Sequence, residues 1–130
     1  MIKTKIFAIG FAVALAAGMT AGSADAADGE KVWNKCKACH TLTAQNRVGP
    51  GLAGSVGRKC GSAKGYKYGK GYQKACDKGF TLDEAFLMDY LKDPSKKLSA
   101  VAGKKVRSKM AFKLKKEDQR KAVIAFLKSK

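Results

Sequence analysis

The chain has 130 residues, and its 27 lysines and arginines against 10 acidic residues give it a formal charge of +17. Because 45% of the residues are hydrophobic, the composition excludes a basic disordered tail and favours one small folded domain. The large positive net charge indicates that this domain binds an acidic partner.

The first 26 residues have the features of a secretory signal peptide. Two lysines precede an apolar stretch over residues 6–17, and residues 24–26 form a small-x-small cleavage site. The apolar stretch is shorter than the roughly 20 residues that span a bilayer, although an uncleaved membrane anchor stays an alternative. We expect cleavage near Ala26 to leave one soluble, exported domain over residues 27–130. Removal of two lysines and one aspartate leaves this domain with a formal charge of +16.

A first helix is expected to begin at Asp28, whose side chain can cap it, and to run as far as Cys36. Val32 and Trp33 are its apolar members. This helix leads directly into a motif of five residues.

The sequence Cys36-Lys37-Ala38-Cys39-His40 is the most informative motif in the chain. Two thiols three positions apart on a helical turn can form thioethers with the two vinyl groups of a haem, and the histidine then lies beneath the iron. The motif therefore predicts one covalent haem c with His40 as an axial ligand. A thioredoxin-type redox pair would need a βαβ context, which the pattern lacks. A zinc site would need further ligands, although His40 is the only histidine.

The rest of the chain shows two further helices separated by loops. Residues 49–71 contain eight glycines in 23 positions and are expected to form ordered turns. A capping box at residues 81–84 predicts a helix that ends at Asp93-Pro94, and a long loop follows as far as Met110. The last helix begins near Glu117. With no repeat and no strand alternation, the sequence predicts an all-α domain.

The sixth ligand position of the iron is expected to be filled by a methionine, since the chain has no second histidine. Met88 lies inside a predicted helix among polar neighbours, where a packing role is more usual. Met110 lies on a loop just before Phe112 and the last helix, so this loop can bring its sulfur to the haem. Met110 is therefore the preferred ligand.

These motifs resemble class I cytochrome c, and especially the bacterial cytochromes c2 with a long loop. The resemblance covers nearly all of residues 27–130, in order: Gly29 with Trp33, the CxxCH motif, Gly49-Pro50-Gly51-Leu52, Gly57-Arg58-Lys59, Met88-Asp89-Tyr90-Leu91, Ser108-Lys109-Met110-Ala111-Phe112 and Ile124-Ala125-Phe126-Leu127-Lys128. It implies the cytochrome c fold, with three main helices and Gly-rich loops wrapped round one haem c. Gly29 and Phe126 would lie where the first and last helices cross.

The resemblance also assigns the residues that hold the haem. It implies that Cys36 and Cys39 bind the haem covalently and that His40 and Met110 are its axial ligands. The carbonyl of Pro50 would accept a hydrogen bond from the second nitrogen of the histidine and fix the ring orientation.

Other residues are expected round the rest of the haem. The resemblance places the Tyr90 hydroxyl near the methionine sulfur, and Arg58, Tyr68 and Ser108 near the haem propionates. Leu82 stands where the family generally has a tryptophan that donates to a propionate, so a neighbouring donor or water must replace it.

Cys60 and Cys76 occupy positions that usually hold other residues in the family. They flank the glycine-rich loop in a chain expected to reach an oxidising compartment, so our hypothesis is a disulfide that closes this loop. Two free buried thiols are the alternative.

The function implied by the resemblance is that of an electron carrier and not of an enzyme, because both axial positions of the iron are filled. A soluble periplasmic monomer would move one electron between membrane redox complexes. Cytochrome bc1 would be the donor, and a terminal oxidase or photosynthetic reaction centre the acceptor. Transfer from a periplasmic dehydrogenase to an oxidase is a further possibility.

Lysines near the haem edge would steer the protein to acidic docking faces. The candidates are Lys35, Lys37, Lys59, Lys105, Lys109, Lys113, Lys115 and Lys116. A ligand-binding or peroxidatic haem protein with an open sixth site stays an alternative. Charge alone would also fit a nucleic-acid-binding module, but nothing else in the chain resembles a recognition motif, and no nucleic-acid partner is expected.

Overall fold

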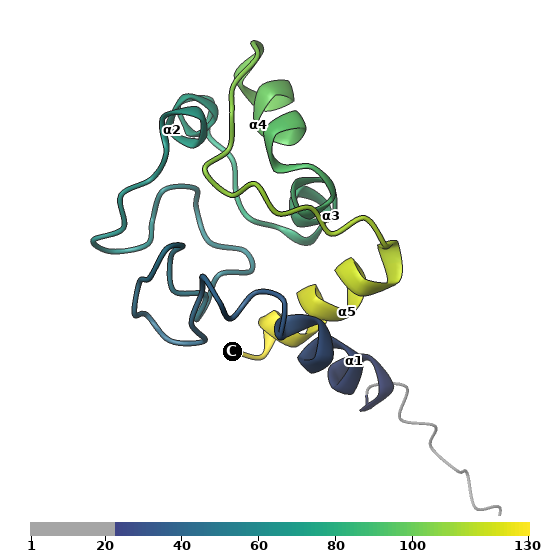
Figure 1. Ribbon diagram of the computed structural model, residues 1–130. Coiled ribbons are helices and arrows are strands. Elements are labelled where there is room, and N and C mark those ends of the chain that lie inside the picture. Colours follow the sequence, from purple (N-terminus) through teal and green to yellow (C-terminus); the bar gives the residue numbers. More distant parts are fainter. Residues whose placement is uncertain (1–22) are drawn as a thin grey trace, which may run out of the picture.

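Figure 1 shows the computed structural model, which describes residues 23–130, with side chains from residue 28 onward. The first 22 residues of the predicted signal peptide lie outside the described residues. The helices of the described part are α1 (Ser23–Trp33), α2 (Lys70–Cys76), α3 (Glu84–Lys92), α4 (Pro94–Ala102) and α5 (Glu117–Lys128). Pairing of extended backbone between residues 23 and 130 is limited to one isolated antiparallel bridge, Lys59 with Thr81. None of these helices is both long and apolar enough to cross a membrane.

The first and last helices cross, as the family resemblance implies (Figure 1). A β-carbon on Gly29 would lie 2.4 Å from the Ala122 carbonyl oxygen and 2.5 Å from the Phe126 β-carbon, so only glycine allows this approach. The Trp33 and Phe126 rings pack beside the crossing, with centroids 6.3 Å apart. Burial of these rings with Val123 and Leu127 makes the crossing one half of the core.

Replacing Gly29 with alanine is expected to destabilise the protein, because the helices must separate to admit the methyl group. Overpacking of this kind costs about 1–3 kcal/mol, which exceeds the roughly 1 kcal/mol that alanine gains in helix propensity. Equilibrium unfolding in denaturant measures the difference. Gly103→Ala is the control, since its left-handed backbone (φ 70°) costs about 1 kcal/mol while nothing lies within 4 Å of its β-carbon position. A Gly29→Ala variant as stable as the parent would contradict the packing argument.

Two predicted helix starts are wrong. Helix α1 begins at Ser23, before the expected cap at Asp28, because the alanines that precede Asp28 are themselves strong helix formers. It ends at Trp33, and turns lead on to the haem motif. Helix α3 is capped by Asp83, whose side chain accepts a 2.7 Å hydrogen bond from the Phe86 amide. Thr81 pairs in the isolated bridge instead.

The predicted loop between Pro94 and Met110 contains helix α4. Asp93 ends α3 and also caps α4, since its side chain accepts a 3.1 Å hydrogen bond from the Lys96 amide. Pro94 is the first residue of α4, a position where the missing N–H costs nothing, and Gly103 ends the helix in a left-handed conformation. Pro94 therefore follows the end of α3, as predicted, and also begins α4.

Helix α2 lies at the end of the glycine-rich segment and completes a second core cluster. Tyr72 and Ala75 of α2 pack there with Phe86 of α3 and Leu98 of α4. A disulfide joins Cys76, at the end of α2, to Cys60, with α-carbons 5.7 Å apart. The hypothesised loop closure is therefore present in the structure.

Removing the disulfide with the paired change Cys60→Ser and Cys76→Ser is expected to lower the free energy of unfolding by about 3 kcal/mol, since the two residues lie 16 positions apart. Unfolding in denaturant with and without a thiol reductant provides the measurement, with the haem iron kept in the same redox state in every sample. The reductant should destabilise the parent and leave the double variant unchanged. In the holoprotein, where Cys36 and Cys39 would be bound to the haem, two thiols that alkylate without reduction would contradict the pairing.

Candidate functional site

A cavity of about 380 Å³ opens between the two core clusters. Its wall contains eight of the predicted haem-site residues: Cys39, His40, Pro50, Arg58, Tyr68, Tyr90, Ser108 and Met110. Leucines from both clusters and tyrosines contribute much of the remaining, mainly apolar lining. The fold thus brings residues as far apart in the sequence as Cys39 and Met110 to one site, as the motifs predict.

His40 enters the cavity from the turns that follow α1. Its amide donates a 3.0 Å hydrogen bond to the Cys36 carbonyl, which holds the CxxCH segment in a helical turn. The ring nitrogen Nδ1 lies 2.8 Å from the carbonyl oxygen of Pro50. Burial lowers the pKa of His40, and the hydrogen bond to Pro50 opposes that shift. A neutral ring that donates through Nδ1 leaves Nε2 available as a ligand.

The two cysteines of the motif form no disulfide with each other or with the Cys60–Cys76 pair. Cys39 lines the cavity, while Cys36 is half-buried beside the α1–α5 core. Burial raises the pKa of the Cys36 thiol. Both sulfurs therefore remain available for thioether bonds.

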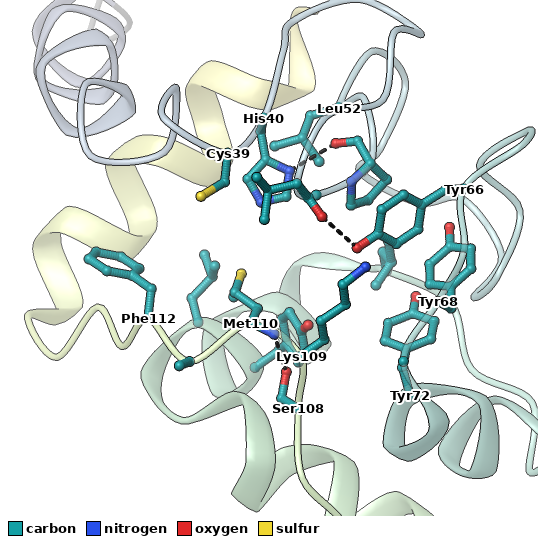
Figure 2. A pocket seen from close by; sticks show the side chains of 18 of the residues that line it. Cys39, His40, Leu52, Tyr66, Tyr68, Tyr72, Ser108, Lys109, Met110 and Phe112 are labelled. Carbon is teal, nitrogen blue, oxygen red and sulfur yellow. Dashed lines mark hydrogen bonds between the residues drawn. The ribbon is translucent and has the colours of Figure 1, made fainter.

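Met110 lies across the cavity from His40. Figure 2 shows its sulfur pointing into the cavity toward the imidazole ring. The Ser108 hydroxyl accepts a 3.1 Å hydrogen bond from the Met110 amide, and the Ser108 amide donates 2.9 Å to the Ser95 hydroxyl. These bonds tie the methionine segment to α4 and fix where the side chain starts.

Tyrosines form another wall of the cavity (Figure 2). The Tyr68 and Tyr72 rings are stacked with centroids 4.6 Å apart, and the Tyr68 hydroxyl accepts a 3.0 Å hydrogen bond from the Ala63 amide. Burial raises the pKa of Tyr90, and the neighbouring Ser108 side chain opposes that shift. Tyr90 therefore stays protonated and can act as a hydrogen-bond donor.

Arg58 lines the cavity and carries a buried donor that a charged group in the cavity could accept from. One of its terminal nitrogens donates a 3.1 Å hydrogen bond to the Gly51 carbonyl, while its Nε is buried without a hydrogen-bond partner among the described residues. Leu82, which replaces the usual tryptophan, is buried in the same wall and offers no donor. A buried donor of this kind needs an acceptor, and a haem propionate is one. Together with the two thiols and the neutral histidine, these groups fit a haem c.

Two residues important to the site were not predicted to have a role there. A β-carbon on Gly49 would lie 2.2 Å from the His40 ring, so this glycine leaves the space that the ring fills. Tyr66 donates a 2.9 Å hydrogen bond from its hydroxyl to the Val48 carbonyl at the cavity wall. The alternation of Tyr66 with Tyr68 could have indicated that both rings face one side. Gly49 belongs to a motif that carries the family resemblance, but that motif does not indicate its contact with His40.

Comparisons with known proteins agree with this geometry, although no protein-family model matches the chain. Cytochrome c2 of Rhodospirillum rubrum is 43% identical over 121 residues, which covers 91% of this chain and 90% of that protein. Cytochrome c-550 of Paracoccus denitrificans is 39% identical over 137 residues, covering 97% and 87%. The structure of ferricytochrome c2 from Rhodopseudomonas palustris matches with a TM-score of 0.75 at 38% identity, covering 81% of this chain and 97% of that one.

Proposed function

Since the chain belongs to the bacterial cytochrome c2 family of class I cytochromes c, we propose that it shuttles single electrons through a haem c ligated by His40 and Met110. Members of this family are electron-transfer proteins with one covalent haem c and are not enzymes. The observation that carries the proposal is the placement of the His40 ring and the Met110 sulfur on facing sides of one apolar cavity.

The chain's own residues would attach and orient the haem. Cys36 and Cys39 would form the two thioethers, while the Pro50 carbonyl would hold the His40 ring through its 2.8 Å contact. When bound, the haem supplies a one-electron ferric–ferrous couple, and methionine ligation in an apolar pocket raises its potential. Exclusion of water by the leucine and tyrosine walls supports the same effect.

The propionates would be held by donors on residues that line the cavity. Arg58 offers its buried Nε, while Tyr68 and Ser108 offer hydroxyl groups from the same lining. The Tyr90 hydroxyl, close to Ser108, would bond the methionine sulfur. Arg58 would thereby compensate for the donor that Leu82 lacks.

We further propose that the protein works in the periplasm after cleavage near Ala26, with residues 27–130 as the mature domain. Helix α1 begins at Ser23, so cleavage there would shorten the helix by its first turn and leave Gly29 and the crossing intact. Sequencing the N-terminus of the exported protein tests the cleavage position.

Donors and acceptors are proposed to be membrane redox complexes with acidic docking faces: cytochrome bc1, and a terminal oxidase or photosynthetic reaction centre. A periplasmic dehydrogenase is an additional donor. The eight lysines named above are all exposed, and Lys109 lines the cavity itself. Val48 and Phe112 also line it and are 65% and 43% exposed, which provides apolar contact at its mouth.

Electron transfer to an acidic partner is expected to slow by about tenfold or more as ionic strength rises, because salt screens the attraction. Stopped-flow oxidation of the reduced protein by each candidate complex, at several salt concentrations, measures this dependence. A rate that does not change with salt would contradict docking through the lysines.

Visible spectra of the holoprotein in both redox states test the ligation. Ligation by His40 and Met110 predicts low-spin spectra and a ferric thioether charge-transfer band, with slow carbon monoxide binding to the ferrous form. Loss of that band together with rapid carbon monoxide binding would instead identify a haem protein with an open sixth site.

A further inference from the structure

A second hollow, of about 340 Å³, lies beside the haem cavity between α2 and the segment at residues 105–109. We call it the basic groove, because its charged lining consists of Lys70, Lys74, Lys105, Arg107 and Lys109. Gly69, Ser108 and Lys109 line both the basic groove and the haem cavity, so the two sites share a wall.

The local backbone explains why these cations meet. Lys70 and Lys74 are four positions apart in α2 and therefore lie on one face of the helix. Along the facing segment, exposed Lys105 and Arg107 flank half-buried Val106, which places their two charges on one side. The Lys109 ammonium turns away to the haem cavity, where it donates a 3.3 Å hydrogen bond to the Lys67 carbonyl.

Close backbone packing brings the cations of α2 near those of the segment that carries Arg107. A β-carbon on Gly71 would lie 2.1 Å from the Arg107 carbonyl oxygen, so the backbones approach as closely as a glycine permits. Like charges held this near one another repel and destabilise the compact state.

No aspartate or glutamate is among the residues that line the basic groove, and the nearest in sequence is Asp77, the cap at the end of α2. Residues 31–76 contain ten basic residues and residues 94–116 contain nine, and neither segment has a single aspartate or glutamate. The ion pairs found among residues 28–130 use Lys97, Lys113, Lys121 and Lys128, which lie outside the groove. The Lys109 ammonium lies over the Tyr66 ring, 4.8 Å from its centroid.

We propose that the basic groove binds a soluble, phosphate-rich anion of the linear oligophosphate class. Two rows of cations match a short chain of phosphates, and Arg107 can hold two phosphate oxygens at once. The anion would offset the repulsion between the rows. This binding does not depend on the proposed function.

Calorimetric titration of the holoprotein with inorganic tripolyphosphate tests the site, at about 0.15 M ionic strength to screen weak contacts. We expect one equivalent to bind and the affinity to fall about tenfold or more in a Lys74→Gln/Arg107→Gln variant. The matched control is Lys31→Gln/Lys92→Gln, which removes the same charge from exposed positions on α1 and α3 and should change affinity less than about twofold.

An equal loss of tripolyphosphate affinity in both double variants would show that the anion is attracted by the overall charge of the protein, and it would overturn the proposal. No saturable binding would overturn it too, as would binding only to vesicles of phosphatidylglycerol. Thermal unfolding of each variant checks that its fold is retained.

A consequence for regulation rests on the proposed function. An anion in the groove would neutralise charge next to the haem cavity and slow electron transfer to an acidic partner. At fixed ionic strength, tripolyphosphate should slow electron transfer from the parent to an acidic partner and should not slow it from the Lys74→Gln/Arg107→Gln variant. Calorimetric binding without this effect would overturn the regulatory role and leave the anion site standing.

Discussion

Replacing Met110 with alanine is expected to abolish the ferric thioether charge-transfer band and to let carbon monoxide bind rapidly to the ferrous form. The side chain points into the cavity from a segment held by Ser108, so its removal opens the position opposite His40. Loss of the thioether should also lower the midpoint potential by roughly 0.1 V or more, because axial ligands set this potential over a wide range. Spectroscopy and redox titration measure both effects.

Met88→Ala is the matched control for this change. Met88 is half-buried in α3 and is absent from the cavity lining. Its replacement should leave the band and the potential nearly unchanged. A band that survives in Met110→Ala, or disappears in Met88→Ala, would contradict ligation by Met110.

Replacing Gly49 with alanine is expected to disrupt the opposite side of the site. The added carbon would lie 2.2 Å from Cε1 of His40 and 2.7 Å from Nδ1, so the ring must move and its 2.8 Å contact with the Pro50 carbonyl must break. Overpacking and the lost hydrogen bond together cost about 3 kcal/mol. Denaturant unfolding of the holoprotein measures that loss, and a weakened low-spin spectrum would accompany it.

The control is Gly54→Asn, a larger substitution at a nearby glycine. Gly54 has a left-handed backbone (φ 66°), which asparagine tolerates, and nothing lies within 4 Å of its β-carbon position. This variant should lose about 1 kcal/mol or less. Stability and spectra that remain at parental values in Gly49→Ala would contradict the close contact.

The elements predicted best from the sequence are those with a complete local pattern. Helix α5 combines acidic residues in its first turn, an apolar stripe and a basic end, and its start at Glu117 is confirmed. Helix α2 has only seven residues and contains Gly71, which allows close contact with the Arg107 backbone. Because glycine is a poor helix former, the local sequence does not predict this helix. Only the packing of distant segments reveals why that glycine is there.

For the candidate site too, the residues in local motifs could be predicted and the contacts between distant segments could not. The CxxCH spacing indicates the haem from five consecutive residues, and the family resemblance brings in Pro50, Arg58 and Met110, which do share one cavity. The space that Gly49 leaves for His40 could not be predicted, because it arises from the folding of one loop against another. The convergence of α2 with residues 105–109 in the basic groove has the same origin.

Asp93 connects three parts of the molecule with one side chain. It ends α3, caps α4 through the Lys96 amide, and pairs with Lys113 at 2.8 Å just beyond Met110. That ion pair lowers the pKa of the Asp93 carboxyl. The two helices and the methionine segment should therefore open as one cooperative unit in native-state hydrogen exchange. Detachment of the methionine would then be limited by partial unfolding of the domain as well as by the strength of an iron–sulfur bond.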